Sequence, residues 1–268
     1  MSSLVLPKSL PQAVRLEFRR AFASPFETPS AIVLNVFLIA LGWWLFPSSL
    51  RGFFFGYSGA HALPLTLLSW MVSDIPATNV LGGDAERMVQ VLEDRPTLLK
   101  MLLAKALVLW LLTAPLCIAL DLAITTGAHN VAVSALTTTV IALVPFATLG
   151  LASWVGILLP YKPMAFRHRR RQLRENPGRA FRWLIAILAP YVVVPVLNMV
   201  CLAPLHVWGL PGDSHRVLGY KFTSFWLVMV SALGVALVMV VVGYRGAQVL
   251  VSRRKQKLVQ FLTSPDLG

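Results

Sequence analysis

A charged connector between two long apolar runs reads Thr78-Asn-Val-Leu-Gly-Gly-Asp-Ala-Glu-Arg-Met-Val-Gln-Val-Leu-Glu-Asp-Arg-Pro-Thr-Leu-Leu-Lys-Met-Leu-Leu-Ala-Lys105. Two glycines in it favour the end of the preceding helix, and Asp84 is placed to cap a new one. Pro96 is expected to end that new helix after about three turns, and Thr97 to cap the next helix. The connector therefore predicts a short amphipathic helix at about 84–95, held between two membrane spans.

The composition is that of an integral membrane protein. Of 268 residues, 57% are hydrophobic and only 13% are charged, and the mean hydropathy is +0.71. A helical span needs about 20 mostly apolar residues, so a single all-α transmembrane domain (1–268) with short loops is expected. The apolar runs predict six spans, at about 30–48, 53–76, 98–121, 131–159, 183–205 and 222–244.

The basic residues predict the orientation of these spans. The net charge is +13, and with the spans placed as above, 21 of the 24 Lys and Arg residues fall on one side. Short basic loops stay in the cytoplasm, so both termini and the connector are expected there. The charge is a topology signal, and no nucleic-acid partner is predicted from it.

The segment before the first span has the pattern of an amphipathic helix. Leu10, Val14, Phe18 and Phe22 recur at four-residue spacing, and three arginines lie off this stripe. Such a helix at 8–24 is expected to lie in the inner membrane interface, with an ordinary solvated leader as the alternative.

Three polar residues in or near the spans are candidates for a substrate pathway: Asn35, Asp121 and Asn198. Asp121 lies about 35 Å along a helix from Leu98, which exceeds a hydrocarbon core of about 30 Å. A solvated position at the outer end of its span is therefore favoured over a substrate role. Amides inside helix bundles more often join helices by hydrogen bonds, so the evidence for the two asparagines is weak. The outer link at 206–221 either dips into the membrane or lies on it.

The sequence offers no pattern for catalysis. It has no Gly-rich phosphate loop, no His-Glu-x-x-His pair and no Cys/His metal spacing. No catalytic residue, metal ligand or cofactor is predicted in this chain, and any ATP-driven motor would be a separate polypeptide.

The connector and its surroundings resemble the permease subunits of type-2 ABC exporters, also called type V ABC transporters. Those proteins have a connecting helix, six spans with both termini inside, and a coupling helix between spans two and three. They also have an irregular segment between spans five and six, here 205–221. A loose family motif is matched at Asn79, Gly83, Asp84, Arg87, Val91, Leu92, Pro96 and Lys105. The chain departs from the family at Glu86-Arg-Met-Val89, where a Glu-Gly-Thr-Leu type run is common.

The resemblance implies a second permease subunit, identical or related, and two cytosolic ATPase subunits that bind ATP and Mg. It implies export of a hydrophobic or amphipathic drug, lipid or peptide across a bacterial cytoplasmic membrane, with spans two and three moving as levers. The coupling helix would enter a groove of the ATPase. Its charges would set the register, and Met88, Val91 and Leu92 would offer an apolar face. The implied contact residues are Asp84, Glu86, Arg87, Met88, Val91, Leu92, Glu93 and Asp94.

Other functions stay open. A substrate-capturing membrane subunit of an importer is one alternative. A secondary carrier would need an ionisable residue at mid-bilayer, which the sequence does not place. An intramembrane enzyme would need a convergent catalytic group, and nothing excludes a membrane scaffold.

Overall fold

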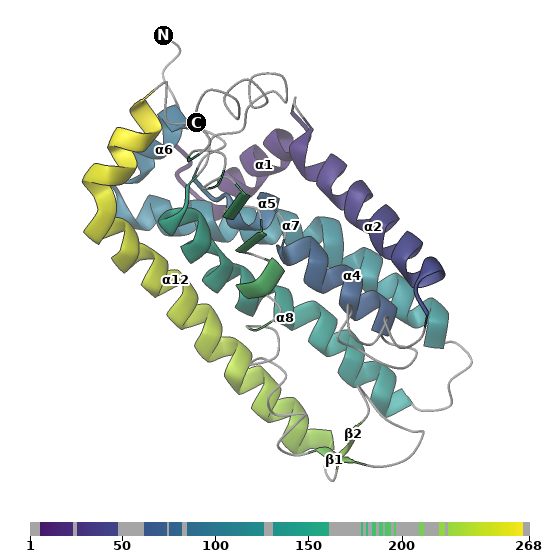
Figure 1. Ribbon diagram of the computed structural model, residues 1–268. Coiled ribbons are helices and arrows are strands. Elements are labelled where there is room, and N and C mark those ends of the chain that lie inside the picture. Colours follow the sequence, from purple (N-terminus) through teal and green to yellow (C-terminus); the bar gives the residue numbers. More distant parts are fainter. Residues whose placement is uncertain are drawn as a thin grey trace.

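The structure is a computed structural model. It describes residues 6–23, 26–47, 62–73, 75–81, 85–125, 131–160 and 225–264, the short strands at 209–211 and 220–222, and isolated residues between 178 and 196. Helices dominate it (Figure 1). They are α1 (Leu10–Ala21), α2 (Glu27–Leu45), α4 (Ala62–Ser73), α5 (Ile75–Thr78), α6 (Ala85–Val91), α7 (Arg95–Thr125), α8 (Val131–Leu158) and α12 (Phe225–Thr263).

Four described helices are long and apolar enough to cross a membrane, which makes the chain a multi-pass membrane protein. These stretches are Thr28–Leu45, Arg95–Ala123, Thr138–Leu158 and Met229–Thr263. They correspond to the first, third, fourth and sixth predicted spans. The second span, 53–76, is described only from residue 62, where the 12 residues of α4 cover about 18 Å. The fifth span, 183–205, lies outside the described residues apart from isolated positions.

Helix α12 is much longer than the predicted span at 222–244. It has 39 residues, or about 58 Å at 1.5 Å per residue, roughly twice a hydrocarbon core. The apolar pattern predicts only the part of α12 that could cross a membrane. The part that follows Tyr244 is charged, since it carries Arg253, Arg254 and Lys255. We call residues 245–263 the α12 extension. It reaches the end of the bundle where α6 lies (Figure 1), which we call the α6 end.

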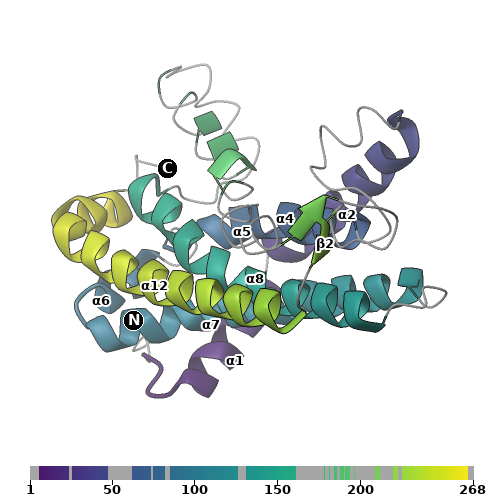
Figure 2. The same cartoon turned by 90° about the horizontal axis from the view of Figure 1, so that it is seen from below.

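Helices α8 and α12 pack along each other and form the most extensive helix pair of the described structure (Figures 1 and 2). A Cβ atom added to Gly243 would lie 2.7 Å from the backbone carbon of Gly150, so the two backbones touch where these glycines meet. The Trp154 indole Nε1 donates a hydrogen bond to the Gly243 oxygen (2.7 Å). Small residues permit such close helix packing inside a membrane.

The described structure is helical as predicted, apart from two strands of three residues each. Strands β1 (Gly209–Pro211) and β2 (Tyr220–Phe222) pair antiparallel, with Leu210 opposite Lys221. The sequence Gly212-Asp-Ser214 follows β1 directly, and these residue types favour a turn. The strands fall in the link expected at 206–221, except for Phe222, and they lie at the other end of α12 from the α6 end (Figure 1).

Candidate functional site

The α6–α7 turn is built differently from the sequence prediction. Helix α6 ends at Val91, and the next helix, α7, begins at Arg95. The cap of α7 is Asp94: its Oδ2 accepts a hydrogen bond from the Thr97 backbone N–H (3.2 Å) and another from the Thr97 hydroxyl. The predictions that Thr97 caps α7 and that Pro96 ends the preceding helix are therefore wrong. Pro96 lies in the first turn of α7, where a missing N–H removes no intrahelical bond.

The apolar side of α6 faces the protein itself. Met88 and Val91 are at most 1% exposed, and Leu92 is also buried. All three belong to the main buried cluster, together with Leu258 and Phe261 of the α12 extension. The expectation that they offer an apolar face to a partner is therefore corrected. Because α6 packs on α12, its apolar stripe completes the core of this chain.

The surface that remains at this turn is acidic. Glu86, Gln90, Glu93 and Asp94 are all exposed. We call Glu86, Glu93 and Asp94 the acidic corner. Lys255 reaches one edge of it, with its Nζ 3.7 Å from a Glu93 carboxylate oxygen. Arg87 is half-buried, and Asp84 lies outside the described residues.

Two elements hold the acidic corner in place. On one side, Gln248 of α12 donates a hydrogen bond from Nε2 to the Arg95 oxygen (3.1 Å), close to the Lys255–Glu93 pair. On the other side, the chain before α6 rests on α8. A Cβ added to Gly156 would lie 1.8 Å from the Thr78 oxygen, so only a glycine permits this contact. The corner is therefore attached to α12, and α5, which precedes it in the chain, is seated on α8.

Helix α1 is docked on α7 near the same end. Glu17 is only 6% exposed, and its carboxylate lies 3.5 Å from Arg20 Nη1 and 4.0 Å from Lys105 Nζ. Lys100 Nζ also donates to the Lys8 oxygen (3.1 Å). Phe18 and Phe22 remain exposed, as an interfacial helix requires, but the buried Glu17 ties α1 to the bundle. Lys105, quoted above for the family motif, thus has a structural partner.

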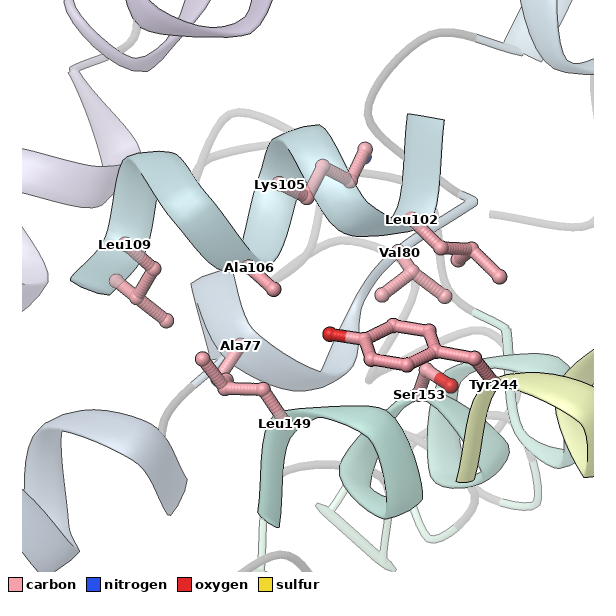
Figure 3. A pocket seen from close by; sticks show the side chains of 9 residues that line it. All are labelled: Ala77, Val80, Leu102, Lys105, Ala106, Leu109, Leu149, Ser153 and Tyr244. Atoms are coloured by element: carbon pink, nitrogen blue, oxygen red, sulfur yellow. The ribbon is translucent and has the colours of Figure 1, made fainter. Parts of the chain in front are cut away.

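A small cavity lies between α5, α7, α8 and α12 (Figure 3). Its volume is about 10 Å³, enough for about one water molecule. The buried Tyr244 hydroxyl points into it among Ala77, Ala106 and Leu149 (Figure 3), and in the described structure this hydroxyl has no hydrogen-bond partner. The cavity is far too small for a drug, lipid or peptide, so it is not a cargo site.

The candidate pathway residues are not brought together on an open surface. Asp121 is 0% exposed, so the expected solvated position is wrong. Helix α7 continues to Thr125, and Asp121 lies on the same face as Cys117 and Ala114, which are equally enclosed. Asn35 is buried within α2, and Asn198 lies outside the described residues. Among the described residues, no group of three or more His, Cys, Asp or Glu side chains is arranged to hold a metal ion.

The sequence did not predict the contacts that several residues of the α6 end make between helices. Arg254 donates from Nη1 to the backbone oxygens of Ile157 (3.2 Å) and Leu158 (2.9 Å), at the end of α8. Gln248, Lys255 and Gly156 also join elements that are far apart in sequence. The one available signal was the amphipathic pattern that continues beyond residue 244, with buried residues at Ala247, Val251 and Leu258.

Comparison with protein-family models, characterised proteins and solved structures finds no match to this chain.

Proposed function

We propose that this chain is the transmembrane permease subunit of an ATP-driven exporter of the type-2 ABC class. The observation that carries the proposal is the acidic corner: an exposed, charged helix–helix turn that leads into one long apolar helix, α7, and is fixed to the end of another, α12. A turn mounted in this way can pass on a push from a partner. Such a partner would be one of two ATPase subunits in the cytosol, which would bind ATP and Mg.

The acidic corner predicts which kind of surface a partner would present to it. Because Met88, Val91 and Leu92 are buried in the chain's own core, the contact would rest mainly on the carboxylates of the corner. A complementary groove would present Arg or Lys side chains, which fix register and accelerate association more than they add affinity. The contact would therefore weaken as salt concentration rises.

In the proposed mechanism, ATP binding draws the two ATPase subunits together and displaces the acidic corner. The displacement favours one of two arrangements of the permease helices and opens a path toward the outside. Two permease subunits, identical or related, would flank this path in a bacterial cytoplasmic membrane, with both termini in the cytosol. The cargo would be a hydrophobic or amphipathic drug, lipid or peptide, which apolar spans tolerate.

One observation favours a second candidate, a secondary carrier. Asp121 is a fully buried carboxylate inside a long apolar helix, and buried ionisable groups in membrane spans often serve ion or proton transport. A carrier of this kind would need no ATPase.

Affinity purification separates the two functions. The tagged chain, isolated in mild detergent from its native host, is expected to bring down an ABC ATPase subunit. Glu86→Gln with Glu93→Gln should lose it, because both exposed carboxylates are removed. Gln256→Lys with Gln260→Lys is the matched control: it adds the same net charge at exposed positions of the α12 extension and should keep the ATPase.

If the unaltered chain brings down no ATPase while other complexes survive, the exporter proposal is wrong. Proton-coupled uptake or efflux that is lost in Asp121→Asn would then support the carrier.

A further inference from the structure

The position of α6 cannot be set by α6 alone. It has seven residues, fewer than the 12 to 15 or so that an isolated helix needs for even marginal stability in water. Its buried side chains Met88 and Val91 belong to one cluster with Leu258, Phe261 and Leu262 of α12. Helix α6 also packs more extensively on α12 than on α7, its neighbour in sequence. The α12 extension is therefore the main support of α6.

The same extension also holds the end of α8. The last carbonyl groups of a helix have no intrahelical donor, and Arg254 supplies one guanidinium nitrogen to two oxygens there, those of Ile157 and Leu158. A cation at this position also matches the negative end of the helix dipole. The next residue, Lys255, pairs with Glu93 of the acidic corner. Two adjacent side chains on one helix thus reach the end of α8 and the corner beside α6.

The α8–α12 pair is itself closely joined. Gly150 meets Gly243 backbone to backbone, Trp154 donates to the Gly243 oxygen, and a Cβ added to Gly246 would lie 2.3 Å from the Trp154 ring. These contacts leave little room for α8 to slide against α12. Helix α5, which precedes α6 in the chain, is seated on α8 through the contact between Gly156 and the Thr78 oxygen.

We propose that the α12 extension fixes α6 to the end of α8, so that α6, α8 and α12 move as one body. The α12 residues that hold this position are Gln248, Arg254 and Lys255. A push on the acidic corner is then delivered to α8 and α12, whereas the resemblance implied that the spans on either side of the connector act as the levers. The attachment of α6 to α8 stands on the contacts above. Only the source of the push rests on the proposed function.

The test is a distance between spin labels on α6 and α8 in the full-length chain in lipid nanodiscs. Gln90 and Leu158 are both exposed and are replaced by Cys in a background with Cys117→Ala and Cys201→Ala. The unaltered contacts should give one narrow distance distribution. Arg254→Gln with Lys255→Gln should broaden it at least twofold.

Arg253→Gln with Lys257→Gln is the matched control, because it removes the same charge from exposed neighbouring positions. It should leave the distribution narrow. Gln248→Ala removes a single hydrogen bond and should broaden the distribution less than the double variant, which keeps the test usable if that variant aggregates. An unchanged distribution in both Gln248→Ala and the Arg254/Lys255 variant would overturn the proposal.

A second arm uses the complex with the ATPase, where one forms. Adding ATP and vanadate should leave the Gln90–Leu158 distance unchanged while it changes the distance from Gln90 to a label at Trp44 on α2. A change in the Gln90–Leu158 distance of the otherwise unaltered complex would overturn the single-body proposal. If no ATPase binds at all, the exporter proposal fails, and the label distances of the isolated chain still decide the role of the α12 extension.

Discussion

Helices α2 and α8 are both apolar enough to cross a membrane, yet they occupy opposite environments. The buried share is 65% in the α8 span and 17% in the α2 span. Helix α8 carries Gly150 and Gly156 at points where other backbones touch it. Helix α2 instead presents large side chains, among them Val33, Phe37 and Trp44, on an exposed surface. Hydropathy thus selects the helices that enter a membrane, while small residues select those that pack at the centre.

The largest effect is expected from filling the closest of these contacts. Gly156→Ala places a Cβ 1.8 Å from the Thr78 oxygen, and the backbone must shift to accommodate it. We expect a loss of about 3 kcal/mol in the free energy of unfolding, the upper part of the usual cost of overpacking. Reversible unfolding in mixed detergent measures it.

Gly234→Ala on α12 is the control for this substitution, because an added Cβ there meets no atom within 4 Å. It should be neutral or slightly stabilising, since Ala favours a helix over Gly. Equal stability of the two variants would show that the α5–α8 contact is not as close as described.

An intermediate effect is expected at the α8–α12 crossing. Trp154→Phe removes the indole donor that bonds to the Gly243 oxygen at 2.7 Å. A hydrogen bond of this type contributes about 1 kcal/mol, so the unfolding free energy should fall by about that amount. Trp44→Phe makes the same chemical change on α2, where the side chain is 81% exposed, and should change stability by less than about 0.5 kcal/mol. Similar losses in both variants would contradict the proposed difference between the helices.

The smallest effect is expected on the open face of α2. Phe37 is 60% exposed, and lipid or detergent can replace its few protein contacts. Phe37→Ala should therefore change the unfolding free energy by no more than about 0.5 kcal/mol. A loss above about 2 kcal/mol would mean that another protein surface covers α2, and a loss that depends on protein concentration would identify a second copy of this chain.

Residue patterns within single segments predicted several helices correctly, but they predicted the helix ends at the connector wrongly. The pattern at 8–24 predicted α1, and the apolar runs predicted the four long described helices, three of them with ends close to those observed and α12 without its last 19 residues. At the connector, Asp94 and Thr97 are both good capping residues, and only the path of the chain decides which one caps α7. A proline such as Pro96 is compatible both with the end of one helix and with the first turn of the next, so its presence does not decide between them.

The sequence predicted where the candidate site lies in the chain, but not which way its apolar side chains face. The charges of Glu86, Glu93 and Asp94 predicted an exposed connector, and these three side chains are indeed exposed. The direction of Met88 and Val91 could not be predicted, because an apolar stripe on a short helix fits a partner's groove and the protein's own core equally well. Met88 and Val91 face the protein's own core because they pack with the α12 extension, about 160 residues later in the chain.

By itself, the sequence determined that this protein enters a membrane as several helices and that a charged turn interrupts them. These properties follow from composition and from periodicity within one segment, which need no knowledge of the neighbours. Only the tertiary structure decided that Asp121 is enclosed, that Glu17 meets Lys105, and that Arg254 holds the end of α8. Each of these depends on contacts between residues that lie far apart in sequence, and such contacts form only when the helices pack.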